Sequence, residues 1–192
     1  MLFNSFAFAL FLPIIFCFYW IIPSTRIRAQ NVLILIASYV FYGMWDWRFL
    51  SLIFISSFVD YVIGLKLHRS DKPFSRKTFF IISLIANFWL LGFFKYFNFF
   101  IDSFIRMLDI FGIKGEFYTL NIILPVGISF YTFQTLSYTI DVYRKRIEPT
   151  RDPLAFFAFV SFFPQLVAGP IERAESLLPQ FTKPRVFNMD YA

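Results

Sequence analysis

The chain has 192 residues, of which 58% are hydrophobic, 23% are aromatic and only 16% are charged. Soluble domains carry about 25% charged residues, and the 31 phenylalanines of this chain exceed what one soluble core holds. The composition therefore excludes an ordinary soluble protein and predicts an all-α, polytopic integral membrane protein.

The net charge of +6 does not indicate nucleic-acid binding. The basic residues lie in short groups between apolar runs, and they form no stripe that alternates with stacking aromatic residues on a polar surface. Loop positioning and contact with anionic lipid explain them better. The single cysteine, Cys17, excludes an intramolecular disulfide. We interpret it as a small buried hydrophobic residue.

The first half of the chain contains four apolar runs that we interpret as membrane spans, at residues 3–22, 31–44, 49–67 and 78–94. Pro13 is expected to kink the first span, and Trp45 with Trp47 is typical of an interfacial aromatic belt. Asp60 lies inside the third span, where a carboxylate is either a functional group or, as we favour here, one that pairs near the cytoplasmic end, close to Lys66.

Two segments of the first half are more polar. Residues 66–77 are expected to form a basic loop, and residues 95–119 an amphipathic helix at the membrane interface or two short helices. Most Lys and Arg residues fall in the loops that follow the first, third and fifth spans. The positive-inside rule therefore predicts that these loops are cytoplasmic and that the N-terminus is periplasmic.

The fifth span, at residues 121–143, is long enough to cross a bilayer core of about 30 Å. Helical spacing places five residues on one face: Phe130, Gln134, Ser137, Tyr138 and Asp141. A polar group that faces hydrocarbon costs several kcal/mol, so this face is expected to point inward. It either joins neighbouring helices or lines a cavity, and Asp141 is expected to pair with Arg144 and Lys145 along the helix.

The next apolar run, at residues 154–163, reaches only about half-way across a membrane as a helix. Pro164 then removes a backbone donor, and Gly169 with Pro170 interrupts the chain again. We predict a re-entrant or sharply kinked element over residues 154–170. Backbone groups freed at membrane depth must meet protein or water, and Gln165 is expected to meet the inward face of the fifth span.

These segments carry a family resemblance. The runs LPVGISFYTFQTLSYTIDVYR (124–144) and FFPQLVAGPIERAESLLPQF (162–181) closely resemble the bacterial alginate O-acetyltransferase branch of the membrane-bound O-acyltransferase (MBOAT) family. The resemblance extends over nearly the whole chain, including the predicted turn FYGMW (41–45) and KYFN (95–98). That branch also includes peptidoglycan O-acetylation proteins and, more distantly, the D-alanine transferase of teichoic acids.

The resemblance implies an O-acyltransferase in the bacterial inner membrane. Such an enzyme takes an acetyl group from acetyl-CoA or a carrier-linked donor in the cytoplasm. It passes the group toward a polysaccharide such as alginate, with the help of periplasmic acetylation proteins. The family's catalytic histidine lies in a later helix than this chain reaches. Residues 1–192 are therefore expected to be the N-terminal portion of one membrane domain, with no catalytic residue and no bound cofactor.

The sequence offers two groups of site residues. The expected cavity-lining residues are Gln134, Ser137, Tyr138, Asp141, Gln165, Glu172 and Arg173. The expected donor-entrance residues are Arg144, Lys145 and Arg146, which would suit the phosphates of a coenzyme A-type donor, although topology bias alone also explains them. No His/Cys cluster has metal-ligand spacing, and His68 is expected to be a solvated loop residue rather than a base.

Two other classes of function stay open on the sequence. A broken helix with intramembrane acids is also typical of a transporter or channel, but the hydropathy shows no inverted repeat. A chain that lacks the catalytic histidine could instead act as a non-catalytic membrane scaffold. A reading frame that continues into further spans would favour the enzyme over the scaffold.

Overall fold

The computed structural model describes residues 4–111, 123–169 and 172–185, and within these ranges every regular element is a helix. The all-α class is therefore confirmed. The long helices are α1 (Phe6–Ile21), α2 (Ile27–Asp46), α3 (Leu50–Arg69), α4 (Pro73–Ile110) and α5 (Ile128–Tyr143). The short ones are α6 (Pro153–Val160), α7 (Phe163–Ala168), α8 (Ala174–Leu177) and the 3-10 turns η1 (Trp47–Phe49) and η2 (Leu178–Phe181).

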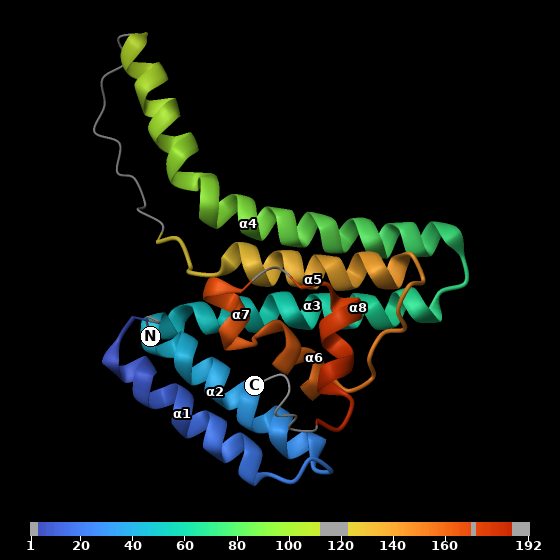
Figure 1. Ribbon diagram of the computed structural model, residues 1–192. Coiled ribbons are helices and arrows are strands. Elements are labelled where there is room, and N and C mark those ends of the chain that lie inside the picture. Colours follow the sequence, from blue (N-terminus) through green and yellow to red (C-terminus); the bar gives the residue numbers. More distant parts are fainter. Residues whose placement is uncertain (1–3, 112–122, 170–171, 186–192) are drawn as a thin grey trace.

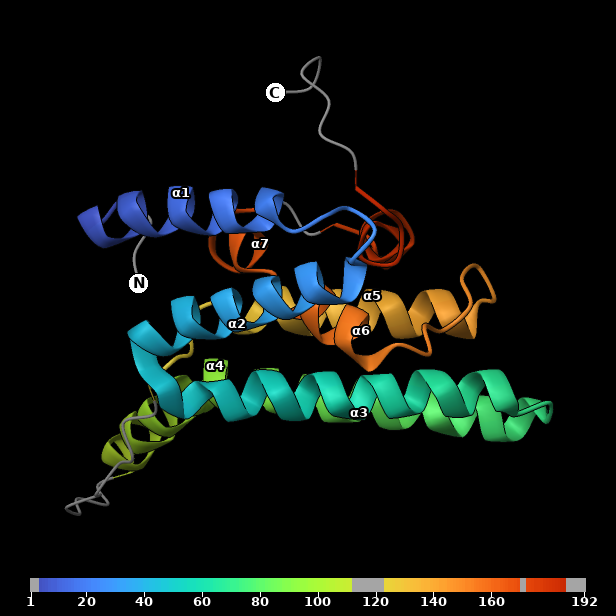
Figure 2. The ribbon, with the colours of Figure 1, turned by 90° about the horizontal axis from the view of Figure 1, so that it is seen from below.

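Helices α3, α4 and α5 pack against one another as a three-helix bundle (Figure 1). Helix α2 crosses beside this bundle and carries α1 on its outer side (Figure 2). The short helix α6 lies between α2 and α3, and it also contacts η2. The core is therefore built around α5 and α6, where the rings of Tyr138 and Phe156 pack with centroids 4.6 Å apart.

Two helical stretches are long and apolar enough to cross a membrane, at Ile27–Arg69 and Pro73–Ile110. Large apolar side chains point outward from the molecule, including Ile36 and Trp89, which are 58% and 66% exposed. Soluble monomers rarely expose such surfaces. These features indicate a membrane protein, whereas the number of five to six membrane elements remains a prediction.

The helices of the first half run further than the sequence predicted. The basic loop shrinks from residues 66–77 to residues 70–72, because α3 continues to Arg69 and Pro73 starts α4 at a position that suits proline. Helix α4 then continues through residues 95–110. The helix predicted there is confirmed, but it is continuous with the fourth span rather than separate, and its position at the membrane interface stays a prediction. Residues 112–119 of that prediction lie outside the described residues. Figure 1 shows the later part of α4 turning away from the bundle.

Two smaller predictions about the first half were also wrong. The FYGMW segment (41–45) lies inside α2 rather than in a turn. Cys17 lies on the exposed side of α1 rather than in a core. The second error has a physical cause: in a membrane protein, apolar composition does not separate the lipid-facing side of a helix from its buried side.

Helix α5 starts later than predicted, at Ile128, after Gly127 with φ 78°. A Cβ on Gly127 would also lie 2.7 Å from the carbonyl oxygen of Leu166 in α7. Only glycine fits this left-handed position so close to another backbone. The start of α5 therefore packs directly against the backbone of α7. Residues 121 and 122 of the predicted span lie outside the described residues.

The predicted break in the following element is confirmed. Helix α6 ends at Val160, and α7 begins at Phe163 with Pro164 in its first turn. The interruption thus lies at residues 161–162, just before Pro164, because proline fits the first turn of a new helix and not the interior of an old one. Gly169 then ends α7.

Candidate functional site

Helix α5 is the most enclosed long helix of the described chain, with ten of its 16 residues buried. Gln134, Tyr138 and Asp141 of the predicted inward face are buried, and Phe130 and Ser137 are half-buried. The burial extends further around α5 than the sequence predicted. Leu136, which is not among the five residues of the predicted inward face, is only 3% exposed.

The broken element leaves backbone groups that its own helices cannot pair. The carbonyl of Phe159, in the last turn of α6, accepts a hydrogen bond from the Gln134 side chain at 3.0 Å. The N–H of Phe163, in the first turn of α7, donates to Ser38 Oγ of α2 at 3.2 Å. Side chains from α5 and α2 therefore satisfy the two sides of the break, as an apolar environment requires.

The predicted contact between the two segments is confirmed. Gln134 Nε2 also donates to Gln165 Oε1 of α7 at 3.2 Å. A further hydrogen bond from this part of the chain lies one turn along α5, where Ser137 Oγ accepts from the N–H of Ala174 at 3.2 Å. Just before Ala174 stand Glu172, half-buried, and Arg173, exposed.

Several buried polar atoms of α5 have no hydrogen-bond partner among the described residues. They include Tyr131 Oη, Thr132 Oγ1 and Asp141 Oδ2. Such atoms are rare inside proteins, and each one needs an explanation such as a water molecule or a ligand. Water or a polar ligand could satisfy these atoms along α5. The assignment of a cavity there remains a prediction.

A second polar cluster holds the three-helix bundle together at Asp60 of α3. The carboxylate is fully buried and accepts from Ser83 Oγ at 2.5 Å, from Asn87 Nδ2 at 2.7 Å and from Thr139 Oγ1 at 3.3 Å. The structural pairing favoured for Asp60 is therefore confirmed, but the partners lie on α4 and α5 rather than near Lys66, which is exposed with its ammonium 5.5 Å from the Phe79 ring centroid.

Ser83 and Asn87 were not predicted from the sequence as site residues. A signal was available: they stand four residues apart, on one face of an otherwise apolar run. Two polar residues at helical spacing within a membrane span indicate a face that meets another polar group.

Asp141 has a different partner from the one the sequence predicted. Helix α5 ends at Tyr143, and Lys145 adopts φ 58°. The N–H groups of Lys145 and Arg146 bond back to the carbonyls of Val142 and Asp141, a Schellman ending. This turn brings Arg146 Nη1 to 4.0 Å from Asp141 Oδ1. The expected pairs with Arg144 and Lys145 were wrong because the helix does not continue.

The donor-entrance candidates Arg144, Lys145 and Arg146 are exposed at this end of α5. Lys145 lines a polar pocket of about 330 Å³ together with His68, Ser70, Asp71, Arg76 and Glu148. His68 is exposed, as expected, although it lies in the last turn of α3 rather than in a loop. Among the described residues, no group of His, Cys, Asp or Glu side chains is suited to holding a metal ion.

Arg76 of α4 organises the same end of the bundle, and sequence reasoning missed it. Its guanidinium donates to the carbonyl of Leu67 in α3 and, at 2.8 Å, to that of Tyr143 in α5. It therefore caps the C-termini of two helices at once. The junctions α1–α2, α3–α4 and α5–α6 lie on one side of the molecule, at the right of Figure 2, where Arg28 Nε is 3.8 Å from Asp152 Oδ2.

Comparison with known proteins identifies relatives that are bacterial O-acetyltransferases. The chain is 40% identical over 179 residues to the probable alginate O-acetylase AlgI of Azotobacter vinelandii, covering 93% of this chain and 35% of that protein. The Pseudomonas aeruginosa protein of the same name is also 40% identical, with 93% and 34% covered. The peptidoglycan O-acetyltransferase of Helicobacter pylori is 36% identical over 212 residues, with 94% and 38% covered.

The chain thus spans about a third of the length of the curated relatives it matches, as the coverage of 35% for the Azotobacter protein illustrates. No protein-family profile matches it. No solved structure matches it either. The predicted resemblance to alginate and peptidoglycan O-acetyltransferases is confirmed over nearly the whole of this chain.

Proposed function

We propose that this chain forms part of the membrane domain of an O-acyltransferase of the membrane-bound O-acyltransferase family. The reaction is transfer of an acetyl group toward a cell-surface glycan, with alginate and peptidoglycan as the two classes that its relatives' names support. The observation that carries the proposal is 40% identity over 93% of the chain to an alginate O-acetylase.

The α5 helix and the broken element would form one wall of the acyl-transfer path. Gln134, Ser137, Tyr138, Asp141 and Gln165 supply polar groups at membrane depth, and Glu172 with Arg173 would stand at its mouth. The unpaired polar atoms of α5 support this role, because a path for a polar group needs partners that lipid does not provide.

The basic end of the bundle would receive the donor, either acetyl-CoA or a carrier-linked acetyl group. Arg144, Lys145 and Arg146 are exposed there and would approach phosphate oxygens, although Arg146 also lies beside Asp141. Periplasmic acetylation proteins would carry the acetyl group onward to the polysaccharide, and membrane lipid surrounds the chain. No nucleic acid takes part.

Catalysis would depend on a histidine that this chain does not supply. His68 is exposed, whereas a base that activates an acceptor hydroxyl needs a position beside that hydroxyl and a partner that orients it. We expect residues 1–192 alone to show no acyl transfer above background.

A chimaera tests the proposal. Residues 1–192 replace the matching third of the Pseudomonas aeruginosa alginate O-acetylase in a strain that lacks this enzyme, and the acetate released from purified alginate by mild alkali is measured. The chimaera should restore acetate, its His68→Ala variant should restore as much, and residues 1–192 alone should restore none. A stably inserted chimaera without activity would contradict the proposal. Turnover by residues 1–192 that His68→Ala abolishes would contradict the assignment of catalysis elsewhere.

The proposed location is the bacterial inner membrane, with the N-terminus in the periplasm. The three basic junctions lie on one side of the molecule (Figure 2), which supports alternation of the spans, and the positive-inside rule supplies the orientation. In a Cys17→Ala background, Ser70→Cys should react with a membrane-impermeant maleimide only after the cells are permeabilised. Labelling of Ser70→Cys in intact cells would reverse the orientation.

A further inference from the structure

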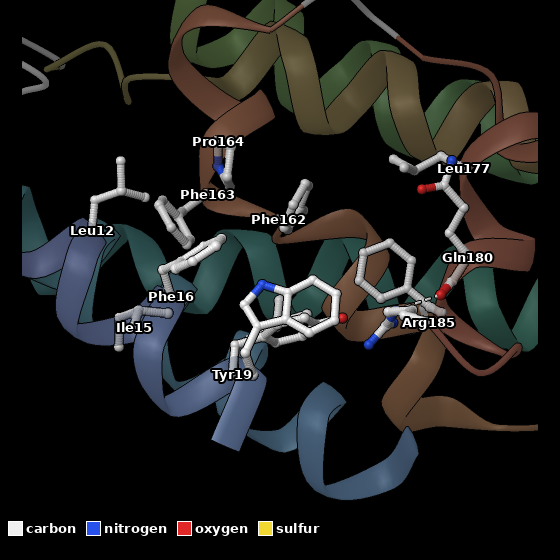
Figure 3. Close-up of a pocket in the computed structure, with 13 residues that line it drawn as sticks. Leu12, Ile15, Phe16, Tyr19, Phe162, Phe163, Pro164, Leu177, Gln180 and Arg185 are labelled. Atoms are coloured by element: carbon white, nitrogen blue, oxygen red, sulfur yellow. Dashed lines mark hydrogen bonds between the residues drawn. The ribbon is translucent and has the colours of Figure 1, made fainter. Parts of the chain in front are cut away.

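An apolar groove of about 320 Å³ runs between α1 and the broken element (Figure 3). It lies apart from the α5 face and from the basic pocket described above. The walls of the groove are aliphatic and aromatic, and they include Leu12, Ile15, Phe16, Phe162, Phe163 and Pro164. Tyr19, Trp20 and Arg185 also line the groove, and Arg185 lies at the opposite end from Leu12 and Ile15 (Figure 3).

Arg185 is a fixed cation at that end. Its Nε donates to the Gln180 carbonyl at 2.7 Å, its Nη2 to Asn31 Oδ1 at 2.8 Å and its Nη1 to Gln30 Oε1 at 3.4 Å. The guanidinium also packs over the Tyr19 ring, 5.6 Å from its centroid. None of the three ion pairs among the described residues involves Arg185. Its position is set by neutral groups, and two of its five N–H donors remain for a ligand.

The groove also has the geometry of a lipid site. Arg185 bonds to the first turns of α2, directly after Arg26 and Arg28, at the basic end of the molecule. From Tyr19 to Leu12 the groove follows α1 for about 10 Å at a rise of 1.5 Å per residue. Half of a bilayer core is about 15 Å thick. The groove therefore leads from a cation at a helix end into the depth at which lipid acyl chains lie.

We propose that this groove binds one acyl chain of an anionic phospholipid, with the lipid phosphate accepting hydrogen bonds from Arg185. Arginine is the side chain best suited to phosphate oxygens because its donors form a planar fork. Arg26 adds positive charge nearby, whereas the charge of Arg28 is partly offset by Asp152, 3.8 Å away. The remaining positive charge favours a lipid with net negative charge over a zwitterionic one. This lipid site goes beyond the acyl-transfer function.

Trp20 supplies a reporter inside the groove. In a variant with Trp45→Phe, Trp47→Phe and Trp89→Phe, Trp20 is the sole tryptophan. The protein is placed in phosphatidylcholine vesicles that contain brominated acyl chains on either phosphatidylglycerol or phosphatidylcholine. The quenching of Trp20 fluorescence is measured over the same range of mole fractions of each brominated lipid. One lipid–arginine contact is worth about a fivefold preference, so the brominated anionic lipid should quench Trp20 at about a fivefold lower mole fraction.

Two matched controls isolate the site. A variant that retains only Trp89, which is 66% exposed on α4, should be quenched equally by both lipids. In the Trp20-only protein, Arg185→Gln should remove the preference for anionic lipid, whereas Arg185→Lys should retain most of it. The far-ultraviolet circular dichroism of each variant shows whether it has folded.

Equal quenching of Trp20 by both lipids would overturn the proposal, because the groove would then hold only bulk lipid. Quenching by neither lipid would also overturn it, since a protein segment would then cover the groove. If Arg185→Gln folds and still prefers anionic lipid, Arg185 is not the group that binds the lipid phosphate, and the proposal is contradicted. Failure of the acyl-transfer chimaera leaves all of these outcomes unchanged.

Discussion

Helices α4 and α5 are neighbours in the same bundle, yet they have nearly opposite surfaces. Helix α4 has 38 residues, and only Ser83, Asn87 and Leu91 of these are buried, each one helical turn from the next. Helix α5 has 16 residues, of which ten are buried. The longer and more apolar helix therefore touches the bundle along one narrow stripe, whereas the shorter and more polar one is its centre.

The difference between α4 and α5 shows which residues identify the buried face of a helix in a membrane protein. Helix α4 qualifies as a membrane-crossing helix by length and hydropathy, and α5 does not. Lipid tails are as apolar as leucine, so apolar side chains do not distinguish lipid from core. Polar side chains do distinguish them, because each needs a partner: Ser83 and Asn87 mark the buried stripe of α4, and Gln134 marks that of α5.

The largest expected effect comes from removing the acceptor that joins α3, α4 and α5. Asp60→Ala leaves the donors of Ser83, Asn87 and Thr139 without their shared acceptor. Each buried unpaired polar group costs about 1–3 kcal/mol, so the free energy of unfolding should fall by about 3 kcal/mol or more. Unfolding of the detergent-solubilised chain by sodium dodecyl sulfate, followed by circular dichroism, measures it.

The matched control for Asp60 is Asp102, an exposed carboxylate on the lightly packed part of α4. Asp102→Ala should change the free energy of unfolding by less than about 0.5 kcal/mol. Lys66→Ala should change the free energy of unfolding by as little as Asp102→Ala does. A Lys66→Ala effect as large as that of Asp60→Ala would restore the ion pair that the sequence predicted and contradict the buried cluster.

The next effect concerns the close approach of α3 and α5. A Cβ on Gly64 would lie 2.7 Å from Cε1 and Oη of Tyr138, whose side chain is fully buried against Phe156. Overpacking of this kind costs about 1–3 kcal/mol, so Gly64→Ala should lower the unfolding free energy by that amount. Gly92 of α4 is the control, because a Cβ there meets nothing within 4 Å. Gly92→Ala should be neutral or stabilise by up to about 1 kcal/mol; a destabilising Gly92→Ala would mean that α4 is covered on that side.

The third effect is smaller and concerns the basic end. Arg76→Ala removes the donors that cap the carbonyls of Leu67 and Tyr143, and it should cost about 1 kcal/mol, since solvent at this end replaces part of the lost bonds. Lys77→Ala removes the same charge from an exposed neighbour and should cost almost nothing. Thermal unfolding in detergent compares the two. Equal losses would show that positive charge, rather than the double cap, stabilises this end.

Sequence reasoning succeeded where one residue type has one physical consequence. Pro164 and Gly169 predicted the broken element, and the need to satisfy its backbone predicted the contact between Gln165 and Gln134. It failed where the outcome depended on a local turn or on tertiary packing. The pairing of Asp141 with Arg146 follows from the left-handed Lys145, and no spacing rule foresees that.

The same distinction explains the residues that were missed. Ser38 satisfies the N–H of Phe163 across 125 positions of sequence, and Arg76 joins two helix ends that only the fold brings together. Nothing in either local sequence marks these roles. The polar cavity, the donor entrance and the orientation in the membrane stay predictions, because each depends on groups outside the described residues or on a membrane side.

The smallest effect tests the link between α5 and the broken element. Gln134 makes two hydrogen bonds, to the Phe159 carbonyl and to Gln165, whereas the Gln165 side chain makes only the bond to Gln134 among the described residues. Gln134→Leu should therefore destabilise more than Gln165→Leu. Side-chain hydrogen bonds between membrane helices average about 0.6 kcal/mol, with a maximum of about 1.7, so the coupling energy from the double-mutant cycle should lie in that range.

The cycle is measured by unfolding in sodium dodecyl sulfate, and the same variants are then compared in the chimaera. Gln165→Leu should reduce acetate transfer while membrane insertion stays intact, because the link orients α7 but does not hold the helices in the membrane. Gln180→Leu is the control, since that side chain is exposed and bonds only to the nearby Ser176 carbonyl. If the losses in unfolding free energy for Gln134→Leu and Gln165→Leu are strictly additive, the two side chains are not coupled and the predicted link is contradicted. Apolar contacts alone would then hold α5 inside the bundle. The polar side chains of α5 would serve only the proposed acyl-transfer path and not the stability of the fold.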